Sequence, residues 1–503
     1  MNRRFNLLLA LLTFVGGCAM APTERLTFPA APFSRIGRTQ WFDVNGDGKA
    51  DFALAKGEDG RVENLLYDDD EDGEPDRSYA MKAVADDVPH VVILLDSIPF
   101  QLVNERCGAG DFAFLRAPRK VIAPFPSLTE VCYTEVLHAP PLPTVIDTQY
   151  DPRQGGHRSD LWKRVVDDYR QPWERRLTYG LSYADTGLTF LDPQKWYAAE
   201  LARAKHAIDD SPRRTTVVYL ASAAAMVCKF GRAGANEVLD GARQLCLQLL
   251  YERRGAIRIS LMADHGHNFV TSKNIDLAAM LTKDGFCVTD KPSSPDDVTI
   301  SINGLVTNAL LQTARPAKVA EALVRNEAVE LAAYVDGADM IVVGKGGRAV
   351  VSSVDGRHFA YRPVGGDPLR YQGLEFQSAI DTKTLTLALP RSTGRGDQVG
   401  MTEPEWLAAT ADHEWPNAPA RLWHAFHRQT VQPPSVMLSL KDGYYCGKPG
   451  YETFITMRST HGGLNQANSA TFVMSTFDTP PGPWLPRDVM KHLMPDGPPA
   501  VVR

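Results

Sequence analysis

The chain has 503 residues, of which 44% are hydrophobic and 23% are charged, and its formal net charge is −6. This length and apolar content are enough for a large buried core, which excludes a disordered chain. The acidic balance, with no basic stripe, argues against nucleic acid as a partner, because a phosphate backbone is met by clustered lysine and arginine.

Residues 1–18 have the pattern of an export signal. Positively charged residues come first, a short apolar run follows, and Gly16, Gly17 and Cys18 come directly after it. The apolar run is too short to cross a bilayer, which is typical of a secretory signal peptide. The end of the segment resembles a bacterial lipobox, so we expect Cys18 to become a lipidated N-terminus. This predicts a lipoprotein of the bacterial cell envelope, in the periplasm or at the outer membrane, held to a membrane only by that lipid. A plain signal peptide with an unmodified cysteine is the alternative.

After a polar tether at residues 19–36, two acidic loops mark a small module at residues 37–85. Oxygen-bearing side chains alternate in both loops, with Asp43, Asn45, Asp47 and Asp51 in the first and Asp68, Asp70, Asp72 and Asp76 in the second. Both follow D-x-[DN]-x-D-G-x-x-D, which wraps oxygen ligands around a hard cation such as Ca²⁺. Neither loop has a glutamate at its twelfth position, so we expect the calcium loops of an extracellular β-rich module, with short strands at 52–57 and 63–68, and no EF-hand. A solvated acidic turn without a metal is the alternative.

Residues 86–503 are expected to form one α/β domain. Short apolar runs predict strands at residues 90–96, 215–222, 257–264, 297–302, 340–344, 436–440 and 471–476. Apolar residues at helical spacing predict helices at 237–253 and, after Pro316, at 317–334. Alternation of strands with helices predicts a doubly wound, mainly parallel sheet sandwiched by helices.

Two stretches interrupt that alternation. Residues 140–212 are polar and aromatic and predict a helical insertion that caps the site. Residues 338–375 contain GG and DG turns between alternating residues, which predict a β-hairpin insertion. Neither stretch carries a motif that identifies a substrate.

Polar side chains stand where predicted strands end. Asp96 ends one strand, and Asp264 and His265 end another, while a proline-punctuated turn at 123–131 presents Ser127 and Thr129. The carboxyl ends of parallel strands meet at one edge of an open sheet, so these groups are expected to lie together. Carboxylates, an imidazole and a hydroxyl are the parts of a metal-assisted hydrolase. Each part also has a plainer explanation, because a strand-terminal Asp often caps a helix and a Pro-Ser pair often marks a turn.

The order of these motifs resembles a known family. Asp96, Ser127, the Asp264-His265-Gly266 run and a late Thr-His-Gly-Gly at 460–463 are similar to the alkaline phosphatase superfamily, nearest its nucleotide pyrophosphatase/phosphodiesterase branch. The resemblance covers residues 88–480. It implies an alkaline-phosphatase-like fold and hydrolysis of phosphate mono- or diesters, on a small molecule or a lipid headgroup. It also implies a zinc ion held by Asp96, Ser127, Asp264 and His265, with Ser127 as the nucleophile and Thr129 in reserve.

The chain departs from this family at the second metal. The family takes an Asp and a His four residues apart, after the strand before the Asp-His-Gly strand, together with the His of the late motif. Here Ala224 and Cys228 stand at the first two positions, and only His461 is kept. Cys228 and His461 make at most a weak zinc site, so one zinc ion is expected and two are not. His267 is a lesser candidate ligand, and Lys229 is a candidate for the missing charge.

Six cysteines follow Cys18. Cys107 and Cys132 flank the same loop and are the first disulfide pair to consider, with buried free thiols as the alternative.

Three functions remain open from the sequence. The chain is an esterase with one metal, a degenerate family member that acts as a binding or assembly module, or a surface protein whose interactions depend on calcium.

Overall fold

The computed structural model describes residues 23–83, 87–145, 148–151, 156–159, 170–301, 304–353, 355–371, 374, 400–447 and 456–494. Cys18 and the expected signal peptide lie outside these residues, so export and lipidation remain predictions. Residues 146–147, 152–155 and 160–169 of the expected cap also lie outside them, as do residues 354, 372–373 and 375 of the expected hairpin insertion. Within the described part of the chain, no helix combines the length and the apolar character that a membrane span requires.

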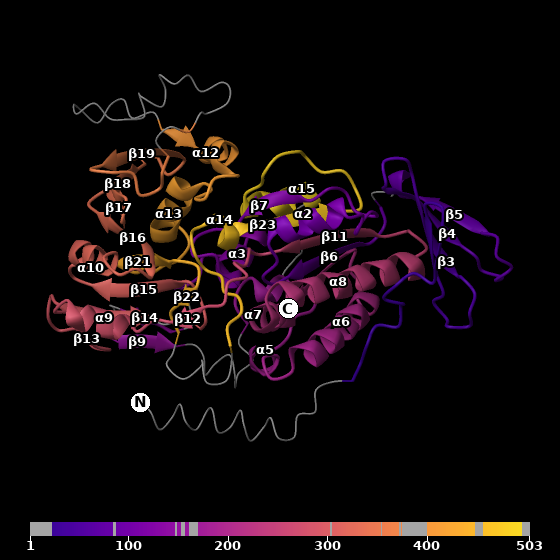
Figure 1. The fold of residues 1–503 in the computed structure, drawn as a ribbon, viewed down its shortest axis with the longest axis horizontal. Coiled ribbons are helices and arrows are strands. Elements are labelled where there is room, and N and C mark those ends of the chain that lie inside the picture. The colour runs from indigo at the N-terminus through magenta and orange to yellow at the C-terminus, as the bar shows by residue number, and fades with distance from the viewer. Residues whose placement is uncertain are drawn as a thin grey trace.

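A five-stranded sheet lies in the middle of the molecule (Figure 1). In spatial order its strands are β10 (Thr215–Leu220), β6 (His90–Leu95), β11 (Arg258–Ala263), β23 (Ala470–Ser475) and β7 (Arg119–Ile122). The first three are parallel to one another, and β23 is antiparallel to both of its neighbours. The carboxyl ends of β10, β6 and β11 therefore meet at one edge.

Helices cover both faces of this sheet. One face packs against α2 (Phe100–Gly108), α6 (Pro193–Asp209), α7 (Ser222–Phe230) and α8 (Arg232–Glu252). The other packs against α3 (Thr129–Val136) and α15 (Pro486–Leu493). Alternate residues of β6 serve the two faces, and all six are buried, which explains why the strand reads as a continuous apolar run.

A second sheet of nine strands lies beside the first, at the left of Figure 1. Its order is β13 (Cys287–Val288), β14 (Asp297–Ser301), β15 (Asn308–Thr313), β21 (Val436–Leu440), β16 (Val329–Asp336), β17 (Asp339–Gly344), β18 (Gly347–Ser352), β19 (His358–Val364) and β20 (Met401–Thr402). All neighbours except β13 and β14 pair antiparallel. The helices α9 (Leu277–Lys283) and α10 (Pro316–Leu323) cover one face, and α12 (Glu403–Thr410) and α13 (Ala418–His427) cover the other.

This second sheet corrects the expectation of a single, mainly parallel sheet. The strands predicted at 297–302, 340–344 and 436–440 belong to this second sheet. The sheet is mainly antiparallel because short hairpins connect several of its strands, and a short turn can join only antiparallel neighbours. The expected helix at 317–334 is wrong in its second half, since α10 ends at Leu323 and β16 follows. The hydrogen bonds of β16 to β21 and β17 stabilise the strand more than the weak helical pattern of its sequence favours a helix.

The two expected insertions also differ from their predictions. Strands β17, β18 and β19 do form hairpins at 338–375, but they extend the nine-stranded sheet rather than stand apart from it. Region 140–212 is not a helical cap throughout. It contains the hairpin β8 (Thr148–Asp151) and β9 (Gly156–Ser159), and its longest helix, α6, packs against the central sheet through Leu201 and Ala204.

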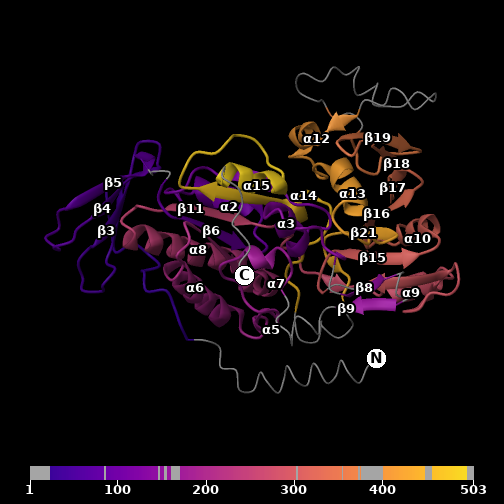
Figure 2. The same ribbon diagram turned by 180° about the vertical axis from the view of Figure 1, so that it is seen from behind.

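The N-terminal module is an antiparallel meander of five strands, at the left of Figure 2. These are β1 (Ser34–Ile36), β2 (Thr39–Phe42), β3 (Phe52–Lys56), β4 (Val62–Tyr67) and β5 (Arg77–Ala80). The buried aromatic rings of Phe28, Phe52 and Tyr67 pack against Tyr251 of α8, and the Tyr67 hydroxyl donates to Leu250 O. The strands expected at 52–57 and 63–68 are β3 and β4, and the acidic loops connect β2 to β3 and β4 to β5.

Candidate active site

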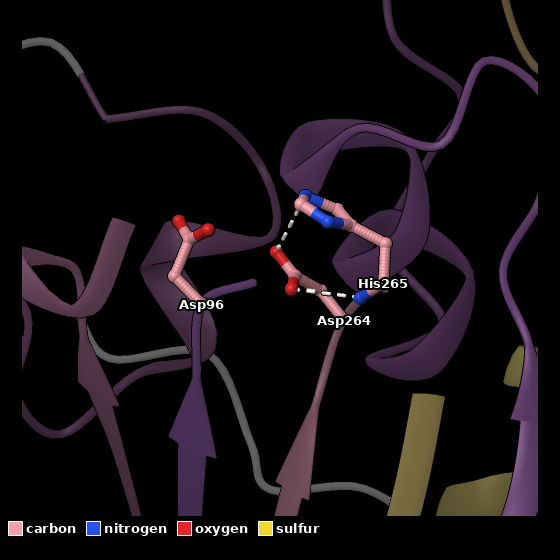
Figure 3. Close-up of side chains that lie close together, drawn as sticks. All are labelled: Asp96, Asp264 and His265. Carbon is pink, nitrogen blue, oxygen red and sulfur yellow. Dashed lines mark hydrogen bonds and ion pairs between the residues drawn. The ribbon is translucent and has the colours of Figure 1, made fainter. Parts of the chain in front are cut away.

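Three buried ligand groups meet at the carboxyl edge of the central sheet. Asp96 follows β6, and Asp264 and His265 follow β11, its parallel neighbour, with Leu95 opposite Ala263 in register. Their ligand atoms all lie within 4.8 Å of one another, as Figure 3 illustrates. The structure therefore brings together the three metal ligands expected from the ends of the two strands.

The surroundings of the Asp264 carboxylate favour a positively charged partner. Its Oδ1 accepts hydrogen bonds from the amides of Ser97 (2.9 Å) and His265 (2.8 Å). Its Oδ2 is buried and accepts no hydrogen bond from the described residues. Burial and the nearby charge of Asp96 raise the pKa of Asp264 well above its usual range. Two buried carboxylates, one of which has an oxygen without a hydrogen-bond donor, fit a divalent cation. The charge of the cation would offset the repulsion between them.

Asp96 is held in place by two hydroxyl groups. Ser97 Oγ donates to its Oδ1 and Tyr219 OH donates to its Oδ2, each at 2.5 Å. Tyr219 comes from β10, so all three parallel strands contribute to the site. Burial, together with the charges of Asp96 and Asp264, raises the pKa of Tyr219 well above its usual range, so its phenol stays a donor.

His265 presents a free ligand atom to the cluster. Its Nδ1 lies 3.0 Å from Gly266 O and donates there, which leaves the Nε2 lone pair 3.3 Å from Asp264 Oδ2. Burial lowers the pKa of His265, which keeps the ring neutral. A neutral imidazole fixed through its other nitrogen by a backbone carbonyl is the usual state of a metal ligand. Glycine is required at 266, because a Cβ there would lie 2.2 Å from Ala467 O.

The Ser127 hydroxyl, expected as the nucleophile and fourth ligand, forms its hydrogen bonds with residues other than Asp96, Asp264 and His265. Its side chain is fully buried, and Oγ lies 2.9 Å from Gly463 O and 3.1 Å from Pro124 O. Arg421 Nη2 donates to the same oxygen at 3.2 Å. The hydroxyl therefore joins the 123–128 turn to the 460–464 loop.

Thr129, the reserve candidate, has a hydroxyl that lies near two members of the cluster. Its Oγ1 lies 3.3 Å from Asp96 Oδ2 and 3.4 Å from His265 Nε2. Thr129 is the first residue of α3, where the helix dipole favours a developing negative charge. With Asp96 and Tyr219, it lines a cavity of 140 Å³.

The other wall of this cavity comes from residues 170–186, the part of the expected cap that reaches the site. Trp173 and Leu177 supply apolar surface, and Arg170 is the one cation among the described residues that line the cavity. Lys229 is not among them, and its ammonium lies 5.8 Å from the ring centroid of Phe230.

The expected second metal site is filled by packing. Ala224 and Cys228 lie on α7, and Cys228 is buried beside Tyr445 and Met457 with its Sγ 3.7 Å from His267 Nε2. In some groups of three acidic, histidine or cysteine side chains among the described residues, the ligand atoms lie within 4.8 Å of one another. None of these groups includes Cys228, His267 or His461.

His461 instead supports the first site. Its ring stacks on His265, with centroids 4.1 Å apart and planes 11° apart, and its Nδ1 lies 3.0 Å from Ser127 O. Burial and the neighbouring His265 lower the pKa of His461 to about 3. Burial and the neighbouring His461 and His265 lower the pKa of His267, so these adjacent imidazoles are neutral.

The disulfide considered for Cys107 and Cys132 is not present. All six cysteines of the described residues are free thiols. Cys132 lies beneath the site and donates to Asp264 O at 2.8 Å, whereas Cys107 Sγ contacts Met474 Sδ at 3.6 Å.

The second acidic loop of the N-terminal module forms another oxygen cluster. Carboxylate oxygens of Asp68, Asp70 and Asp76 lie within 4.8 Å of one another. Asp68 Oδ2 accepts from Gly73 N (2.9 Å), while its Oδ1 is buried without a donor among the described residues. This orphaned oxygen points to a cation, as Asp264 Oδ2 does.

The first loop is folded in the same way. Asp43 Oδ2 accepts from Gly48 N (2.9 Å), as Asp68 does from Gly73, and Asp51 accepts from Val44 N and Asn45 N. The expected Asp47 is exposed, and its Oδ1 accepts from Lys49 N. In the second loop, Asp72 Oδ1 accepts from Glu74 N, the equivalent bond.

Comparison with known proteins finds similarity among solved structures. No protein-family model matches the chain, and no curated protein matches it. Among solved structures, the fold is similar to murine ectonucleotide pyrophosphatase/phosphodiesterase 5, with a TM-score of 0.45 and 10% sequence identity. The similarity covers 82% of this chain and 96% of that chain.

Two site residues were not expected from the sequence. Tyr219 stands near the end of the strand predicted at 215–222, where a phenol in an otherwise apolar run was its only signal. Ser97 follows Asp96 directly and turns the chain with a φ of 68°. Both orient Asp96, so they support a ligand rather than serve as one.

Proposed function

We propose that this chain is a metal-dependent hydrolase of phosphate mono- or diesters in which Thr129 is the nucleophile. The observation that supports this most is the position of Thr129 Oγ1, within 3.4 Å of both Asp96 and His265 in a cluster of three buried ligands. No other serine or threonine hydroxyl within the described residues combines these contacts with a place on the cavity wall.

Asp96, Asp264, His265 and Thr129 would hold one zinc ion. When bound, such an ion lowers the pKa of a coordinated hydroxyl and stabilises charge on phosphoryl oxygens. Ser97 and Tyr219 orient Asp96, and the Gly266 carbonyl orients His265.

The proposed reaction begins at Thr129. Its hydroxyl proton passes to Asp96 Oδ2, 3.3 Å away. The oxygen forms a bond to phosphorus as the bond to the ester oxygen breaks. The leaving alkoxide takes a proton from water, and the hydroxide left behind takes back the proton that Asp96 holds. A second water then hydrolyses the phospho-threonine, which restores the hydroxyl and releases phosphate or a phosphate monoester. The N-terminus of α3 favours the anionic phosphoryl group throughout.

A single metal leaves one side of the phosphoryl group without a second cation. In the proposed enzyme, Arg170 supplies the positive charge that was expected from Lys229, because Arg170 lines the cavity and Lys229 does not. Trp173 and Tyr219 give that cavity an aromatic wall, which suits an ester with an apolar leaving group.

Zinc content and turnover test the proposal together. Purified residues 19–503 are expected to carry about one zinc ion per chain and to hydrolyse phosphate mono- or diesters, since only one complete ligand set is present. The measurements are metal analysis and release of a chromogenic leaving group, before and after chelation. A chain that binds no zinc and turns over neither ester would contradict the proposal and favour a degenerate binding or assembly module.

We also propose that the second acidic loop binds one calcium ion, because Asp68 Oδ1 is buried and orphaned beside Asp70 and Asp76. Calcium at 100 times its Kd is expected to stabilise the folded chain by about 2.7 kcal/mol. Titration calorimetry with calcium checks the binding, with a Kd on the order of 10⁻⁴ to 10⁻³ M expected for an extracellular module.

Asp68→Asn is expected to remove this binding. Asp43→Asn is the matched control, because Asp43 makes the same bond in a loop whose carboxylates do not meet. Equal calcium affinity in the chain and in Asp68→Asn would refute the assignment.

A further inference from the structure

A second cavity lies on another side of α3, between that helix, α13 and α15. Its volume is 470 Å³, within the range of small-molecule sites. Its polar wall includes Glu135, His138, His424, Arg428, Arg487 and Lys491. Asp96, Asp264, His265 and Thr129 are not part of this wall, so the cavity is separate from the candidate active site.

The charge of this wall is mainly positive. Arg428, at the end of α13, is exposed and forms no ion pair with the described residues, and its guanidinium lies 5.4 Å from the ring centroid of Trp423. Lys491 pairs with Asp488 at an exposed position, where an ion pair contributes little and leaves the ammonium available. Glu135 is the one carboxylate among the lining residues, and burial raises its pKa.

One residue of the cavity wall, His424, carries an unpartnered polar atom. His424 is 6% exposed, and its Nε2 lies 3.0 Å from Glu403 Oε2, which also accepts from Arg487. Its Nδ1 is buried and has no hydrogen-bond partner among the described residues. Buried polar groups are normally paired, so this nitrogen indicates a missing partner.

Glu403 orients the side chains of His424 and Arg487, which both line the cavity. Although burial favours its neutral form, His424 and Arg487 hold the pKa of Glu403 down at about 2. Its other oxygen accepts from Asn417 at 3.2 Å. The imidazole and the guanidinium are therefore oriented before any ligand arrives, which lowers the entropy cost of binding.

We propose that this cavity binds a small organic anion. Arg428 and Lys491 contact its carboxylate or phosphate group, and His424 Nδ1 hydrogen-bonds another polar group of the molecule. The volume exceeds what a free inorganic ion needs, which favours an organic molecule over an ion alone.

Calorimetric titration with succinate and with inorganic phosphate tests this site and distinguishes the two anionic groups. The double variant Arg428→Gln/Lys491→Gln is expected to bind at least one probe about tenfold more weakly than the unmodified chain. The matched control is Arg325→Gln/Lys283→Gln, which removes the same charge from the region of α9 and α10 and is expected to bind as the unmodified chain does.

Phosphate-ester hydrolysis is measured on the same preparations, and its rate is expected to be the same in all three chains. Equal probe binding by the Arg428→Gln/Lys491→Gln variant and the unmodified chain would overturn the proposal, as would no binding of either probe at millimolar concentration. A parallel fall of hydrolysis and binding would also overturn it, because the cavity would then belong to the active site.

Discussion

Thr129→Ala will lower phosphate-ester turnover about 10³-fold or more, whereas Ser127→Ala will stay within about fivefold of the unmodified chain. The two hydroxyls are two residues apart, but only Thr129 Oγ1 contacts Asp96 and His265. Ser127 Oγ instead contacts Gly463 O and Arg421. The measurement is kcat on a chromogenic ester with zinc content determined in parallel.

The controls separate chemistry from folding. Thr129→Ser keeps a hydroxyl and is expected to retain part of the turnover. Ser127→Ala leaves buried polar groups unpaired and is expected to destabilise the chain by about 1–3 kcal/mol while it stays active. Equal loss of turnover in Ser127→Ala and Thr129→Ala, at normal zinc content, would show that the nucleophile has been assigned to the wrong residue.

Asp264→Asn will abolish zinc binding and leave the zinc-free chain at least as stable as the zinc-free parent. In the parent, two buried carboxylates face each other and Asp264 Oδ2 has no donor, so removing one charge relieves a cost of folding. Zinc at 100 times its Kd is expected to stabilise the parent by about 2.7 kcal/mol and the variant not at all. Calorimetric unfolding with and without zinc measures both effects.

Asp297→Asn is expected to change the stability of the chain in the opposite direction. Asp297 accepts backbone hydrogen bonds from Ser293 and Ser294, which lower its pKa, so its charge stabilises the fold. This variant is expected to lower stability and keep zinc binding. If zinc-free Asp264→Asn unfolded well below the zinc-free parent, Asp264 would be a structural carboxylate and the metal assignment would fail.

The acidic loops illustrate the limit of motif spacing. The shared pattern of Asp, Asn and Gly predicted two similar turns, and each loop makes the equivalent bond, from Gly48 to Asp43 and from Gly73 to Asp68. Only in the second loop do three carboxylates meet within 4.8 Å. The spacing encodes the local turn, but the distance between side chains also depends on how the adjoining strands hold the loop.

The nine-stranded sheet was the largest feature that the sequence did not predict. Strands at 297–302, 340–344 and 436–440 were expected, but their sheet was not, because apolar runs give a strand's position and not its partner. Residues 329–334 carry a helical pattern that is compatible with α10, yet they form part of β16. Hydrogen bonds to two neighbouring strands stabilise them there, which no local pattern contains.

The sequence by itself determined the three ligands of the candidate site. Asp96, Asp264 and His265 follow buried strands directly, and parallel strands in register must bring such residues to one edge. Only the tertiary structure decided which hydroxyl joins them. The turn after β7 carries two hydroxyls. The start of α3 and the contacts of Ser127 with Gly463 and Arg421, residues about 300 positions further along the chain, determine that Thr129 is the one near Asp96 and His265.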